Sequence, residues 1–96
     1  MNLLVTYDVR TDDAAGRTRL RKVARICEGF GQRVQYSVFE VVCSRTDLAR
    51  LLDRLSQVIE PSKDSLRVYP IYSDSFDVVT TIGSSMALPL DEPWTL

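Results

Sequence analysis

One carboxylate in this sequence occupies a position that could support catalysis. Residues 1–8 read MNLLVTYD, and the apolar run at 3–5 predicts a buried strand that ends at Asp8. A carboxylate at a strand end is held by a rigid element yet is open to solvent, which suits a metal ligand or a general base. The alternative is that Asp8 only opens a turn, because Asp favours turn positions.

Other kinds of catalytic group are scarce. The 96-residue chain contains no histidine, which excludes a Ser–His or Cys–His pair, an imidazole base and the usual zinc sites within one chain. Its two cysteines, Cys27 and Cys43, form no C-x-x-C pair and fall on apolar faces, so we expect buried free thiols. Any catalysis must therefore use carboxylates, a metal ion or water.

The net charge of −1 conceals an asymmetry along the chain. Residues 1–45 hold eight Arg or Lys against five acids, a net +3, whereas residues 46–96 hold four against eight, a net −4. Three arginines spaced four apart share one face of a predicted helix: Arg17, Arg21 and Arg25. Such a row can follow the phosphates of a polyanion, and it is equally typical of a solvated helix surface.

Composition predicts one ordinary globular domain, with 45% apolar and 26% charged residues. No apolar run approaches the roughly 20 residues that span a bilayer, and the first residues do not resemble a secretory signal. We therefore expect a cytoplasmic protein without membrane attachment. The expected domain covers residues 1–83, followed by a tail at 84–96 without regular periodicity.

Apolar spacing predicts two helices, over residues 14–30 and 46–59. Asp12 or Asp13 is expected to cap the start of the first helix, and these two acids are favoured as caps over ligands for a second metal. Gly29 or Gly31 is expected to end that helix.

The remaining patterns predict extended chain. Residues 33–43 contain no Gly or Pro and form either one long strand or two strands that meet at a kink. Further strands are predicted over 66–72 and 76–82. Pro70 cannot donate to a strand ladder, so it implies a sheet edge or a bulge in its strand.

Counting 33–43 as two strands gives the order βαββαβ over the first seventy residues. This is the α+β arrangement of a ferredoxin-like domain. Two helices would cover one face of its sheet, and an apolar face left bare would favour a dimer.

Three segments of the chain resemble the CRISPR-associated "Cas two" proteins. They are LVTYD at 4–8, RTRL at 17–20 and GFGQRVQYSVFE at 29–40, of which the last is the most specific. The segment DSLRVYPI at 64–71 is similar to the fourth strand of the family. The resemblance extends from residue 1 to about residue 83 and does not include the tail.

This resemblance implies a ferredoxin-like protomer in a homodimer, with an additional C-terminal strand added to the neighbour's sheet. Family members act with a partner integrase in acquiring new spacers from foreign DNA. Some are described as magnesium-dependent endonucleases that cut single-stranded RNA or double-stranded DNA.

The resemblance also implies roles for individual residues. The metal-binding and catalytic aspartate of the family corresponds to Asp8. Its functional arginines, expected to bind nucleic acid, correspond to Arg17, Arg19 and Arg33. Residues of the same motifs that are expected to support the site are Tyr7, Ser37 and Phe39. On size alone, Phe39 suits packing at an interface slightly better than stacking on a base. The connection between Asp8 and Arg17 is slightly longer than in the family.

Two functions remain open on these residues. A twofold axis would bring Asp8 against its own copy, giving two oxygen ligands for magnesium and a shared hydrolytic site. Alternatively, the dimer is a non-catalytic scaffold that clamps duplex DNA for the integrase, in which case the arginines matter and Asp8 does not. A third interpretation, a ferredoxin-like domain unrelated to CRISPR, would require the match at 29–40 to be accidental.

Overall fold

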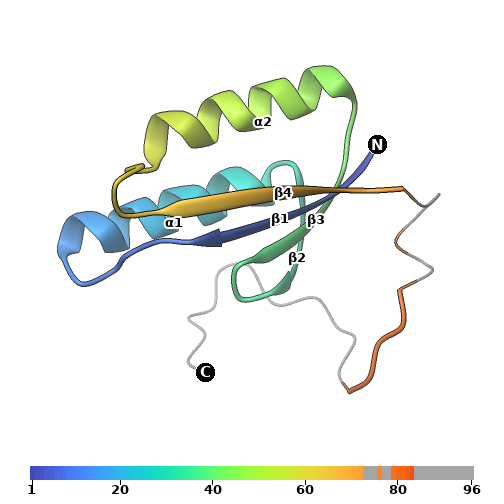
Figure 1. Cartoon of the computed structure of the whole chain (residues 1–96), viewed down its shortest axis with the longest axis horizontal. Coiled ribbons are helices and arrows are strands. Elements are labelled where there is room, and N and C mark those ends of the chain that lie inside the picture. The colour runs from blue at the N-terminus through green and yellow to red at the C-terminus, as the bar shows by residue number, and fades with distance from the viewer. Residues whose placement is uncertain (73–75, 77–78, 84–96) are drawn as a thin grey trace.

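The computed structural model describes residues 1–72, 76 and 79–83. These residues form four strands and two helices (Figure 1). In chain order the elements are β1 (Asn2–Asp8), α1 (Ala14–Glu28), β2 (Gly31–Gln35), β3 (Val38–Val42), α2 (Arg45–Val58) and β4 (Ser65–Ile71). The order βαββαβ confirms the predicted ferredoxin-like α+β fold.

The four strands form one antiparallel sheet in the order β2-β3-β1-β4. Both helices lie on the same side of it (Figure 1). We call the opposite side the helix-free face. Strand β4 is an edge of the sheet and contains Pro70, which is the first of the two alternatives predicted from that residue, a sheet edge or a bulge.

The extended stretch at 33–43 is two strands rather than one. A turn at Tyr36 and Ser37 separates β2 from β3. Their register shifts between Arg33 and Gln35, where β2 contains a bulge. Such a turn lacks the Asn-Gly or Asp-Gly signal of common hairpins, which is why the alternation of side chains alone left both possibilities open.

Each helix begins where a polar side chain caps it. Asp13 is the N-cap of α1, and its Oδ1 accepts a hydrogen bond from the backbone N–H of Gly16 at 2.7 Å. Ser44 caps α2 by accepting from the N–H of Asp47 at 3.1 Å. Gly29 ends α1 as one of the two predicted alternatives. These caps satisfy N–H groups that the first helical turn leaves without partners.

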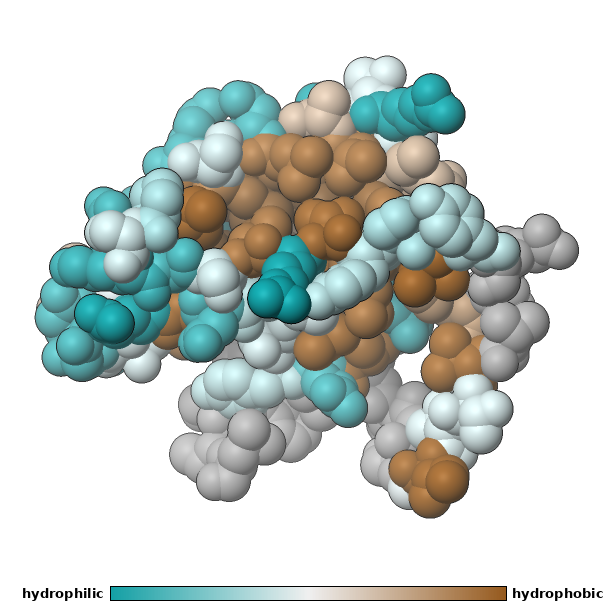
Figure 2. Space-filling view, in the orientation of Figure 1, coloured by the Kyte–Doolittle hydropathy of each residue, from teal (hydrophilic) through white to brown (hydrophobic). Residues whose placement is uncertain are grey.

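The hydrophobic core lies between the helices and the sheet. Figure 2 shows hydrophobic side chains gathered between α2 and the sheet, with hydrophilic residues around them. Cys27 is buried and Cys43 is half-buried, and both are free thiols as expected. The fully buried side chains include Val5, Val23, Cys27, Phe39, Val41, Leu51 and Leu55.

The strand and the tail predicted for the end of the chain lie only partly within the described residues. Of the predicted strand at 76–82, the described residues 76 and 79–82 belong to no strand, and residues 77 and 78 lie outside the described part. The predicted tail at 84–96 also lies outside it. Among the described residues, no helix is long and apolar enough to cross a bilayer.

We predict that Leu51→Ala lowers the free energy of unfolding by about 2–5 kcal/mol, because it removes a fully buried side chain and leaves a cavity. Leu52→Ala is the matched control, since its neighbour on the same helix is 41% exposed, and we expect a loss below about 1 kcal/mol. Urea denaturation followed by circular dichroism measures both. Equal losses in the two variants would contradict this assignment of the core.

Candidate nucleic-acid and metal site

Asp8 is the last residue of β1 and is exposed to solvent. It pairs in register with Ser65, the first residue of β4. Side chains alternate along a strand, and the buried Leu3, Val5 and Tyr7 face the helices. Asp8 therefore belongs to the helix-free face, on a strand end that β4 holds in place.

A polar and a positively charged side chain share the helix-free face with Asp8. Thr6 precedes it by two residues and pairs with Arg67 on β4, so this exposed arginine shares the face with Asp8. The Nη1 of Arg67 donates a hydrogen bond to the Tyr69 hydroxyl at 3.2 Å. Sequence analysis did not single out Arg67, although the alternation within β4 could have placed it on this face. A cation here suits an anionic ligand.

Three predicted site residues form a cluster on the opposite, helix-covered side of the sheet. The rings of Tyr7 and Phe39 stack with centroids 6.2 Å apart. The guanidinium carbon of Arg33 lies 5.2 Å from the centre of the Phe39 ring, a cation–π contact. Phe39 is fully buried, so packing is its role within this chain. The cluster lies directly behind the end of β1.

This cluster contains buried polar atoms without complete partners. Among the described residues, neither the Tyr7 hydroxyl nor Nε of Arg33 has a hydrogen-bond partner. Burial raises the pKa of Tyr7 to about 12, and the neighbouring Arg33 guanidinium only partly opposes this increase. Burial likewise raises the pKa of the Cys27 thiol to about 12, so that thiol is not a nucleophile at neutral pH.

Ser37 contributes through its backbone. Its carbonyl oxygen accepts a hydrogen bond from the backbone N–H of Tyr7 at 3.2 Å. The β2–β3 turn is thereby attached to β1 one residue before Asp8. The predicted site residues Tyr7, Ser37 and Phe39 thus support the strand end from inside the fold.

The three predicted arginines have different surroundings. Arg17 lies in the first turn of α1 and is exposed, and its Nη1 reaches the Thr11 carbonyl at 3.5 Å. Arg33 is buried, with Nη2 3.9 Å from a Glu28 carboxylate oxygen. Arg19 is half-buried and forms an ion pair with Asp64, Nε to Oδ2, at 2.9 Å. Only Arg17 has a guanidinium open to solvent.

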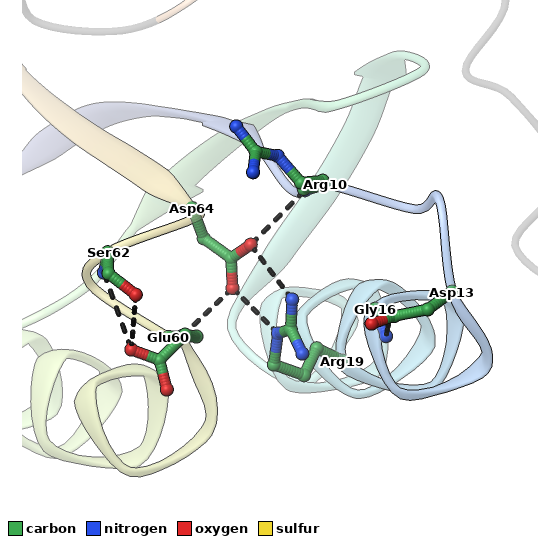
Figure 3. Close-up of polar contacts among 7 residues, drawn as sticks. All are labelled: Arg10, Asp13, Gly16, Arg19, Glu60, Ser62 and Asp64. Carbon is green, nitrogen blue, oxygen red and sulfur yellow. Dashed lines mark hydrogen bonds and ion pairs between the residues drawn. The ribbon is translucent and has the colours of Figure 1, made fainter.

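Asp64 is a residue that sequence reasoning missed. It receives hydrogen bonds from Arg19, from the backbone N–H of Arg10 and from that of Glu60 (Figure 3). Burial by itself would raise the pKa of Asp64, but Arg19 and the two N–H groups hold this pKa below its usual value. Its partners Arg10 and Arg19 lie 54 and 45 residues away in sequence, so no local pattern identified the contact.

The described residues offer few ligands for the expected metal ion. Among the described residues, no group of three or more His, Cys, Asp or Glu side chains could hold an ion. Asp8 offers one exposed carboxylate, which suits magnesium because this ion binds through one or two carboxylates and keeps several waters. One chain therefore supplies one of the two Asp8 carboxylates that are expected to bind the ion.

The buried Tyr7 hydroxyl predicts a dependence of stability on alkaline pH. The pKa of Tyr7 is raised from 10.0 to about 12, so between these pH values the unfolded chain ionises at this residue while the folded chain stays neutral. Its contribution is complete below pH 10 and is lost as pH rises, by at most about 1.4 kcal/mol per pH unit. Tyr7→Phe should remove this part of the slope in urea titrations. Tyr72→Phe, at a position 95% exposed, is the control, and identical slopes in both variants would refute the assignment.

Known proteins of one family resemble this chain over most of its length. The family model described as CRISPR associated protein Cas2 matches residues 1–79. The "CRISPR-associated endoribonuclease Cas2 1" of Moorella thermoacetica is 42% identical over 96 residues, covering 100% of both chains. The "CRISPR-associated endonuclease Cas2" of Halalkalibacterium halodurans is 43% identical over 97% of each chain.

A solved structure gives the same result. The crystal structure of Streptococcus pyogenes Cas2 at pH 6.5 has 44% sequence identity and a TM-score of 0.77, covering 86% of this chain and 100% of that one. The chain therefore belongs to the CRISPR-associated Cas2 family.

Proposed function

We propose that this protein is a magnesium-dependent endonuclease that works as a homodimer, with Asp8 of each protomer at a shared site. The observation that carries the proposal is the exposed Asp8 at the end of β1, on the sheet face that no helix covers. Two relatives named endoribonuclease and endonuclease support hydrolysis of a phosphodiester.

A second copy of this chain suits the helix-free face. Val42 and Tyr69 are 67% and 43% exposed, and the register places both on that face, with Asn2 and Leu4 of β1 between them. Burying such side chains against a copy favours association. A twofold interface brings equivalent residues together at its axis, which would supply the second Asp8. Among the described residues, the outer edge of β4 pairs with no further strand in the order β2-β3-β1-β4, so it would be available to a segment of the neighbour.

The residues of the proposed site have different roles. Asp8 holds the magnesium ion, which, when bound, stabilises negative charge on the phosphate and makes a water more acidic. Arg17 binds a phosphate through its exposed guanidinium. The sequence also predicts Arg19 and Arg33 as contacts to nucleic acid, but each lies beside an acid of this chain, so the proposed phosphate contact rests on Arg17. Tyr7, Ser37 and Phe39 keep the end of β1 in position.

The proposed biological role is spacer acquisition in a CRISPR system, together with an integrase partner. The family assignment supports a CRISPR role, and the substrate is single-stranded RNA or double-stranded DNA. The alternative is a dimeric scaffold that binds duplex DNA for the integrase without cutting it. One observation favours it: among the described residues, one chain has no cluster of metal ligands.

We expect Asp8→Asn to lower magnesium-dependent cleavage by at least about 100-fold, because the change removes the charge that holds the ion. Binding of nucleic acid should be retained, since Asp8 contributes no positive charge. The measurement uses labelled single-stranded RNA and duplex DNA, with magnesium or with a chelator. Asp12→Asn is the matched control, an exposed acid in the following loop, and should cleave as the wild type does.

Two other outcomes would be decisive. Cleavage that persists in Asp8→Asn would refute the proposed metal site. No cleavage in any preparation, with duplex binding weakened in Arg17→Ala, would establish the scaffold instead.

A further inference from the structure

The Asp64 carboxylate joins three segments that meet near the end of β1 (Figure 3). Its Oδ1 accepts hydrogen bonds from the Arg10 backbone N–H at 3.1 Å and from Nη2 of Arg19 at 3.3 Å. Its Oδ2 accepts from Nε of Arg19 at 2.9 Å and from the Glu60 N–H at 2.8 Å. The side chain of Asp64 is 0% exposed and that of Arg19 is 16% exposed. The accepting carboxylate is therefore shielded from water, while its four bonds are partly buried.

These bonds extend the attachment of β1 to β4 beyond the last strand pair. Asp8 and Ser65 form that pair, Asp64 immediately precedes Ser65, and Arg10 follows Asp8 by two residues. The bond from the Arg10 N–H to Asp64 thus fixes the direction in which the chain leaves the strand after Asp8. Without it, the ladder would end at Asp8 itself, where strand ends fray.

The same peptide segment is also fixed from its other side. A Cβ atom added at Gly16 would collide with the carbonyl oxygen of Arg10, so the first turn of α1 packs directly on this backbone. Asp13 caps that turn through the Gly16 N–H (Figure 3). The Arg10 residue is thereby held between Asp64 at its N–H and α1 at its carbonyl.

Glu60, whose backbone N–H donates to Asp64, is itself held by Ser62. The Ser62 hydroxyl donates to Oε1 of Glu60 at 2.9 Å, and the Ser62 N–H lies 3.4 Å from the same oxygen. The loop between α2 and β4 is therefore ordered around Asp64. Asp64 is therefore the group that joins these three segments to one another.

We propose that Arg19 and Asp64 are positioning residues for Asp8, and that Arg19 acts through Asp64 rather than by binding phosphate. Nε and Nη2 of Arg19 both donate to the Asp64 carboxylate, so this side of the guanidinium faces Asp64 and not a phosphate. Arg17, two residues earlier, donates only a 3.5 Å contact to a backbone carbonyl and is exposed. A rigid strand end keeps a catalytic carboxylate within the narrow geometry that a shared site requires.

The effect on activity rests on the function proposed for Asp8, whereas the effect on the segment after β1 does not. Buried ion pairs contribute little net stability compared with apolar replacements, and their best-supported use is to specify one arrangement. In this chain, the Arg19–Asp64 pair specifies the direction in which the chain leaves β1, relative to α1 and to the α2–β4 loop.

The first test is amide hydrogen exchange in the protein as isolated, resolved at residues 8–13. In Asp64→Asn we expect the Arg10 amide to exchange at least about ten-fold faster, while amides in the middle of β1 keep their protection. Asp53→Asn is the matched control, because Asp53 is an exposed acid on α2 whose Oδ2 accepts one side-chain hydrogen bond from Gln57. Unchanged exchange at Arg10 in Asp64→Asn would overturn the inference.

The second test separates the two arginines by the salt dependence of duplex binding. Each phosphate contact contributes about 0.9 to the slope of log affinity against log salt, so Arg17→Ala should reduce the slope by about that amount. Arg19→Ala leaves a buried carboxylate unpaired, so it is combined with Asp64→Asn to keep the chain folded. We expect this double variant to keep the wild-type slope, and a loss equal to that of Arg17→Ala would overturn the inference.

The third readout is cleavage. In Asp64→Asn we expect kcat to fall about ten-fold or more with an unchanged KM, because the substrate still binds while Asp8 is displaced. If Asp8→Asn cleaves like the wild type, the proposed function fails, and the exchange and salt measurements still decide the positioning role. If Asp8→Asn is inactive but Asp64→Asn has the wild-type kcat, the positioning role alone is overturned.

Discussion

Coverage of the sheet by helices on one side only is the constraint on which the rest of this structure depends. Because α1 and α2 lie on the same side (Figure 1), successive side chains of β1 enter different environments. Tyr7 is 5% exposed and packs within the core, whereas Asp8, the next residue, is exposed on the other face. The candidate site and the core that supports it are therefore separated by a single peptide bond.

This arrangement explains why residues of one sequence motif have different roles. Arg33 and Phe39 turn toward the helices and form the cluster behind β1. Glu40, the neighbour of Phe39, is opposite Leu4 and faces the other way. A single strand motif thus contributes both to the core and to the helix-free face, and sequence proximity does not mean spatial proximity of side chains.

Charged and polar side chains of this protein connect its helices and strands to one another, in addition to any contact with a ligand. The Arg19–Asp64 pair joins α1 to the start of β4, and the Asp13 and Ser44 caps fix where each helix begins. A charge count therefore overestimates the cationic surface available to phosphates, because Arg19 and Arg33 already face acids of the same chain. Arg17, at the exposed first turn of α1, is the predicted phosphate contact with an open guanidinium.

By itself, the sequence determined the two helices, a cap at Asp12 or Asp13 for the first of them, an edge or a bulge at Pro70, and the strand that ends at Asp8. Each of these follows from contacts within a few residues or from a period of two or 3.6, so a local pattern contains the information. Tertiary structure decided that 33–43 is two strands, that Arg33 is buried, and that Arg19 binds Asp64. Those outcomes depend on groups up to 45 residues apart along the chain, which approach only when the sheet has formed, and no local pattern encodes the approach.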